Sequence, residues 1–192
     1  MHIKHLIASL FCLAALASPW AHAATLEGQT FDSSVRLAGH DLRLNGLGLR
    51  AVLVIKGYVA GLYLSDKAAS LQEMSALPGP KRLQLRMLRG AGPDDFNKAL
   101  VHGIRRNASE AEQARLHDRI AQLEQKIQVI GNTVKGDVIN LDYLPGQGTI
   151  LAVNGAVKGP AIAGADFYDA VLGIFVGEHP VDGRLKKGLL GQ

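Results

Sequence analysis

Apolar and polar residues alternate along much of the chain between residues 26 and 64. Arg43, for example, separates Leu42 from Leu44. A period of two places the apolar side chains on one face of a half-buried strand. By the same reasoning, we expect a more apolar strand at 52–64, another strand at 82–88, and turns at Gly39-His40 and Asn45-Gly46.

The middle of the chain has the spacing of helices instead. A short helix is expected at 66–76, and Pro93 followed by Asp94 and Asp95 is typical of a helix start. The helix predicted at 93–107 carries Phe96, Leu100, Gly103 and Ile104 on one face.

A longer helix is predicted from Ser109 to Ile130, because Ser109 and Glu112 have the spacing of a capping box. Steps of four and three residues give it an apolar stripe. A short coiled-coil seam has this pattern, but two heptads are few, so packing on a sheet is the simpler interpretation. The stripe consists of Leu116, Ile120, Leu123, Ile127 and Ile130.

Hairpin signals dominate the segment that follows. Pro145-Gly146-Gln147-Gly148 and Asn154-Gly155 predict tight turns between strands at 137–143, 148–153 and 156–162. Helices are expected again at 166–176 and 182–190. Strands and helices arranged in such blocks predict an α+β protein, with an antiparallel sheet and helices on one of its faces.

The first 23 residues have the three parts of a signal peptide. Lys4 provides a basic start, an apolar run covers 6–17, and Ala21-His22-Ala23 fits the cleavage pattern. The run is about a dozen residues, short of the roughly 20 that a membrane span needs. We therefore expect an exported protein that begins at Ala24 and forms one domain over 24–192, with no membrane span.

Composition excludes several kinds of chemistry. Cys12 is the only cysteine and lies in the leader, so the mature chain has no thiol for disulfides, catalysis or metal binding. Without Lys4, 20 basic residues stand against 17 acidic ones, and they form no patch of the kind that binds nucleic acid. No phosphate-binding loop, dinucleotide fingerprint or Gly-x-Ser-x-Gly motif occurs, so no cofactor is expected. No metal site is expected either, because the mature histidines are isolated: His40, His102, His117 and His179.

The segment Asn45-Gly46-Leu47-Gly48-Leu49-Arg50, with Lys56 to Leu64 after it, resembles the chalcone isomerase family, in particular its bacterial exported branch. The resemblance continues at Pro93–Phe96, Lys135–Asp137, Gly148–Gly155 and Asp166–Gly177. It implies an open-faced β-sandwich, in which a large antiparallel sheet carries a layer of helices on one face. It also implies a ligand in an apolar cleft between sheet and helices, and a periplasmic location.

The same resemblance allows the catalytic positions to be compared. In the plant enzymes an arginine holds a phenolate while hydroxyl side chains polarise a carbonyl, and Arg50 matches that arginine. The other positions depart: Tyr58 replaces a threonine, Phe96 a tyrosine, Gly103 an asparagine and Ile174 a threonine. Each lost oxyanion donor costs on the order of 100-fold in rate. Ring closure of the plant type is therefore not expected.

Three functions remain open. The first is non-catalytic binding of a small amphipathic or aromatic anion, such as a fatty acid. An arginine fork suits its carboxylate, and the expected ligand-binding residues are Arg50, Tyr58, Phe96, Leu100, Gly103 and Ile174.

The second is an intramolecular lyase or isomerase acting on a chalcone-like enone, with Arg50 and Tyr58 as catalytic residues. The third is a structural or partner-binding protein of the cell envelope that uses the stripe at 116–130. For Arg50, the alternative to ligand binding is structural: an ion pair with Asp137 or Asp142, or a packed stem with its charged head in water.

Overall fold

The computed structural model describes residues 23–192. The predicted signal peptide, with Cys12 and Trp20, lies outside the described residues except for Ala23. Seven antiparallel strands form one sheet in the order β3-β4-β5-β6-β7-β8-β9, and β1 pairs with β2 in a separate hairpin. Their bounds are β1 (Ala24–Leu26), β2 (Gln29–Phe31), β3 (Ser34–Leu37), β4 (His40–Val52), β5 (Ile55–Leu64), β6 (Lys81–Met87), β7 (Val138–Leu144), β8 (Gly148–Val153) and β9 (Ala156–Val157).

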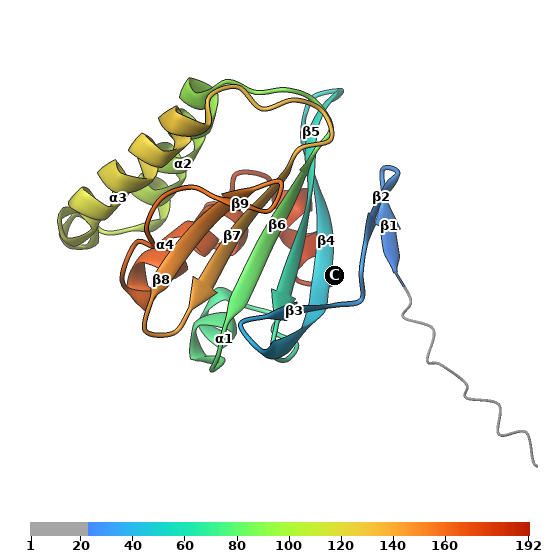
Figure 1. Cartoon of the computed structure of the whole chain (residues 1–192), viewed down its shortest axis with the longest axis horizontal. Helices are drawn as coiled ribbons and strands as arrows, with labels where there is room; N and C mark the ends of the chain where they lie inside the picture. The colour runs from blue at the N-terminus through green and yellow to red at the C-terminus, as the bar shows by residue number, and fades with distance from the viewer. Residues whose placement is uncertain (1–22) are drawn as a thin grey trace, which may run out of the picture.

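Five helices complete the fold: α1 (Leu71–Ala76), α2 (Pro93–Asn107), α3 (Glu110–Ile130), α4 (Ala165–Val176) and α5 (Gly183–Leu189). Figure 1 shows α2, α3 and α4 on one side of the sheet, whereas the β1–β2 hairpin lies beside β4. The order of strands and helices confirms the predicted α+β class with a helical layer on one face. Among residues 23–192, no helix is long and apolar enough to cross a bilayer.

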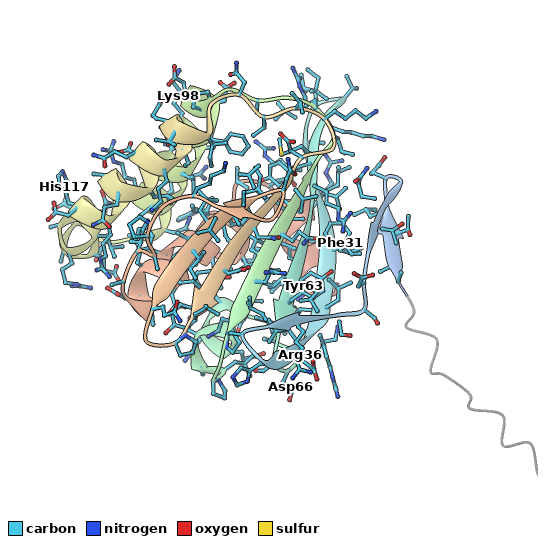
Figure 2. All side chains as sticks on the ribbon, in the orientation of Figure 1. Phe31, Arg36, Tyr63, Asp66, Lys98 and His117 are labelled. Carbon is cyan, nitrogen blue, oxygen red and sulfur yellow. The ribbon has the colours of Figure 1, made fainter. Side chains whose placement is uncertain are left out.

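Each face of the sheet has its own apolar core. The larger core lies between sheet and helices and includes Leu83 of β6 and Phe167 of α4, both fully buried. The smaller core contains Phe31, Leu42 and Tyr63, and the Tyr63 hydroxyl donates to the carbonyl of Asp32 (3.1 Å). Figure 2 shows Phe31 and Tyr63 near β4 and β5, while Lys98 and His117 point outward from the helical layer.

The glycines of the family-like segment bring α5 directly onto β4. A Cβ added at Gly48 would lie 2.4 Å from the carbonyl oxygen of Leu185, and one at Gly46 would collide with Gly188. Asn45 is buried beside them and donates to the carbonyls of Ala68 (3.0 Å) and Leu189 (2.8 Å). Residues 46, 48 and 50 share one face of β4 because side chains alternate along a strand. The segment therefore aims Arg50 toward the start of α5.

Four details of the sequence prediction are wrong. The helix expected at 66–76 begins only at Leu71, after its N-cap Ser70. Asn45-Gly46 is not a turn, because β4 continues through it with an irregularity between Leu44 and Gly46. The side chain of Asn45 hydrogen-bonds to the backbone of Ala68 and Leu189 instead of capping a turn. The strand expected at 52–64 is broken by a turn at residues 53–54. The strand expected at 156–162 is only two residues long, although Ile162 forms an isolated bridge with Thr149.

Candidate ligand-binding site

An apolar slot lies between the sheet and the helical layer. Its floor includes Leu85 of β6 and Ile139 of β7, and its roof includes Leu123 and Ile127 of α3. The slot encloses a cavity of about 70 Å³. This volume is below the roughly 300–1,000 Å³ that is usual for small-molecule sites, so the slot is narrow and a ligand chain must part the side chains that line it.

Polar groups are scarce in this slot. Only two of the lining side chains, Tyr58 and Thr133, carry a hydroxyl. The Thr133 hydroxyl is engaged by the backbone of Ala91, with the N–H and the carbonyl oxygen both at 3.1 Å. Among residues 23–192, the Tyr58 hydroxyl has no hydrogen-bond partner. Of the two hydroxyl side chains in the described lining, it is thus the uncommitted one.

A second hollow, here called the mouth, adjoins the slot and is charged. Tyr58, Phe96 and Ala99 line both hollows. The mouth adds Arg50 and Arg89 as cations, and one acid, Asp95 of α2 (further lining residues include Val52, Ile55 and Met87). The site therefore has an apolar interior and an opening lined by two guanidinium groups.

Arg50 is positioned by contacts at the start of α5. Its Nη1 donates to the carbonyl of Ala51 (2.9 Å) and to Oδ2 of Asp182 (3.4 Å), and its side chain remains 25% exposed. Asp182 is the N-cap of α5, and its Oδ1 accepts from the N–H groups of Arg184 and Leu185. The ion pair expected with Asp137 or Asp142 is not formed, because Asp142 pairs with Arg82 instead (2.6 Å) and Asp137 is bound by Asn154.

The charges around Arg50 set the ionisation of its neighbours. Burial raises the pKa of Asp182, but the N–H groups it accepts at the start of α5 and at Ala51, together with Arg50, bring the net pKa below its ordinary value. Burial also raises the pKa of Tyr58, which Arg50 lowers and Asp182 raises by smaller amounts. Near neutral pH the neighbours of Arg50 are thus the ionised carboxylate of Asp182 and the neutral phenol of Tyr58.

Most of the predicted ligand-binding residues lie together. Tyr58, Phe96, Leu100 and Ile174 all line the slot. Arg50 lies at the mouth rather than in the slot, and its Cα is the cross-strand partner of that of Tyr58.

Gly103 does not line the slot. A Cβ at Gly103 would lie 2.7 Å from Cγ2 of Ile174, so this glycine lets α2 approach α4 closely. Its place in the fold is that of a packing residue.

The residues of the site that the sequence reasoning missed include Arg89, Ala99 and Asp182. Arg89 directly follows a predicted strand, where a cation can reach a sheet edge, and this could have drawn attention to it. Ala99 carries no chemical signal. Asp182 is far from Arg50 in sequence, and the sequence around it indicates only that it can cap a helix. Among residues 23–192, no three His, Cys, Asp or Glu side chains are grouped so as to hold a metal ion.

A curled antiparallel sheet under helices, with an apolar slot between them, defines an open-faced β-sandwich. Residues 23–191 match the chalcone isomerase-like family, and the chain belongs to that family. Among solved structures, it is similar to a fatty-acid binding protein of Arabidopsis thaliana, with a TM-score of 0.66 and 16% sequence identity over 88% of this chain and 96% of that one. At this identity the likeness concerns the fold alone. No curated protein matches.

Proposed function

We propose that this protein binds a small amphipathic anion, such as a fatty acid, without catalysis. The apolar part lies in the slot and the acid group at the mouth, beside Arg50. The observation that carries this proposal is the adjacency of the two hollows, which share Tyr58, Phe96 and Ala99. The similar Arabidopsis thaliana structure is that of a fatty-acid binding protein, which supports the same class of ligand.

The chemistry of the lining favours a chain with one polar end. A narrow slot with one free hydroxyl offers dispersion contacts and removal of apolar surface from water, but few hydrogen bonds. The two guanidinium groups provide charge-assisted donors for a carboxylate. Tyr58 stands between these regions and donates a third hydrogen bond, because its phenol stays protonated. We also propose that the protein works after export to the periplasm, on the basis of the predicted signal peptide.

Replacing Arg50 with alanine is expected to weaken the binding of fatty acids by about tenfold or more, since a hydrogen bond to a charged group contributes about 1.5–3 kcal/mol. Displacement of a polarity-sensitive dye by palmitate measures the change. Arg36→Ala is the control, because Arg36 is an exposed arginine of β3. Palmitate affinity equal in wild type, Arg50→Ala and Arg36→Ala would exclude Arg50 from the site.

Asp182→Asn is expected to act in the opposite direction. Asn is as good an N-cap as Asp, so α5 should stay in place, while the carboxylate that competes for Arg50 is removed. Palmitate affinity should rise by roughly fivefold, because the lost charge interaction between Asp182 and Arg50 contributes about 1 kcal/mol. The same dye assay measures it, and thermal unfolding checks the cap. Weaker binding with unchanged stability would show that Asp182 assists the ligand rather than competing with it.

The isomerase alternative has one favourable observation, the phenol of Tyr58 in the mouth beside Arg50. Against it stand the apolar side chains of Phe96 and Ile174, which supply no donor for a developing oxyanion. Binding is therefore the function that the geometry supports better.

The partner-binding alternative depended on the stripe at 116–130 being free. Leu116, Leu123 and Ile127 are buried, and the other two stripe residues pack against the larger core while partly exposed. Leu123, Ile127 and Ile130 line the slot, so most of the stripe faces the sheet. Because Ile120 and Ile130 stay partly exposed, the support for a role as an envelope scaffold is reduced but not removed.

A further inference from the structure

The turn between β4 and β5 exposes four consecutive apolar residues, Val52, Leu53, Val54 and Ile55, here called the apolar tip. Leu53 and Val54 are 90% and 91% exposed, and the flanking two are about half exposed. These large side chains therefore protrude from the protein surface. Apolar groups gathered in this way mark an interaction site more often than scattered single ones do.

The backbone of the tip is unusual for its sequence. Val52 and Ile55 are cross-strand partners, so Leu53 and Val54 form a two-residue turn. Leu53 has a φ of 53°, in the left-handed region where glycine or asparagine is the usual choice. Leu53 thus places a large apolar side chain at a backbone conformation that disfavours it. This indicates a functional role for the exposed side chain.

Two cations lie on segments next to the base of the tip. Arg89 follows β6, and Lys135 lies in the loop between α3 and β7. Backbone bonds from Leu88 to Gly57 and from Gly136 to Met87, both 2.9 Å, hold these segments beside the base of the turn. Figure 1 shows the turn and that loop at the same end of the sheet. Among residues 23–192, neither Arg89 nor Lys135 forms an ion pair.

The same loop adds a fifth apolar side chain, Val134, which is exposed. The acids near the tip are largely engaged: Glu27 pairs with Lys56 (2.6 Å), Asp182 pairs with Arg50, and Asp137 accepts hydrogen bonds from Asn154 (2.9 Å) and the N–H of Val134 (2.8 Å). Asp95 remains at the mouth.

We propose that the apolar tip inserts into the surface of a bilayer that contains anionic lipid, with Arg89 and Lys135 on the phosphate groups. A narrow protruding turn suits the headgroup region, whereas a stable protein interface needs a broad area of about 800 Å² per partner. Val52 and Ile55 also line the mouth, so the docked protein would hold its opening against the membrane. The docking itself does not require that the slot bind fatty acid.

The test places an environment-sensitive fluorophore on the tip. In a Cys12→Ser background, Leu53→Cys is labelled with nitrobenzoxadiazole and mixed with vesicles of phosphatidylglycerol and phosphatidylcholine, without fatty acid. We expect a blue shift of the emission and quenching by nitroxide-labelled lipid. Ala38→Cys is the control, because Ala38 lies in the β3–β4 turn at the opposite end of β4, and its label should show neither effect.

Three further variants test the apolar tip and the two cations separately, with the label moved to Ile55→Cys. Leu53→Asp with Val54→Asp should lower partitioning into these vesicles by roughly 100-fold. Arg89→Ala and Lys135→Ala should each lower it roughly fivefold, and only when anionic lipid is present.

An equal response at residues 38 and 53, or none at 53, would overturn the proposal. So would a blue shift that rises with protein concentration in the absence of vesicles, since it would assign the tip to a second copy of the chain. The fatty-acid proposal is decided by the dye assay alone, so each can fail without the other.

Discussion

Gly48→Val is expected to lower the free energy of unfolding by about 3 kcal/mol, the upper part of the usual range for overpacking. The new side chain would collide with the backbone of Leu185, where the ideal Cβ position is already 2.4 Å from the carbonyl oxygen. A backbone atom cannot rotate away as a side chain can, so α5 must move off β4. Thermal denaturation should show a decrease of roughly 10 °C in Tm.

Gly183→Ala is the control for this substitution. Gly183 begins the same helix, has no atom within 4 Å of an added Cβ, and does not need a positive φ. Its replacement should leave the free energy of unfolding within about 1 kcal/mol or raise it slightly. If Gly48→Val and Gly183→Ala were equally stable, the close contact between β4 and α5 would not exist.

The contact also matters for the site. Asp182 caps α5 and binds Arg50, so any displacement of α5 moves the carboxylate that restrains the guanidinium. The segment Asn45–Arg50, which the sequence suggested as a ligand-binding segment, therefore also has a structural role. Its glycines give α5 access to β4, and only its last residue faces the mouth.

Local signals in the sequence were enough for several elements. The capping box of Ser109 and Glu112 is formed as predicted at the start of α3. Asn154 and Gly155 both have positive φ in the tight turn between β8 and β9, as a hairpin of that sequence demands. In each case the residues that carry the signal also form the structure, so neighbours in sequence suffice.

The turn at residues 53–54 could not be found in this way. Leu53 and Val54 carry no turn signal and have high strand propensity, so a pattern reading continues the strand through them. The ion-pair partner of Arg50 was missed for a different reason. Asp137 and Asp142 were the two candidates, and only the packing of α5 on β4 brings a different acid, Asp182, within reach of Arg50.

The slot was expected from the family resemblance and not from the residues alone. Phe96, Leu100 and Ile174 have the spacing of ordinary core residues, and nothing in their pattern distinguishes a lined cavity from a filled core. That difference depends on how far helices stand from the sheet, which is a property of the whole packing arrangement.

Ala99→Trp is expected to abolish most fatty-acid binding while the fold stays intact. Ala99 is an exposed residue of α2 and lines both the slot and the mouth. An indole at this position fills the junction between them. Since no buried group is displaced, Tm should change by less than about 2 °C. Palmitate affinity should decrease by roughly 100-fold, because the chain can enter only by pushing the indole aside.

Ala111→Trp, on the exposed first turn of α3, adds the same indole away from both hollows and should bind palmitate normally. A neutral ligand separates the two ends of the site. Hexadecanol should lose affinity with Ala99→Trp but not with Arg50→Ala, because only the first substitution obstructs the chain. Palmitate should lose affinity with both. If Ala99→Trp bound palmitate as the wild type does, the ligand would not pass through the slot, whatever Arg50 contributes.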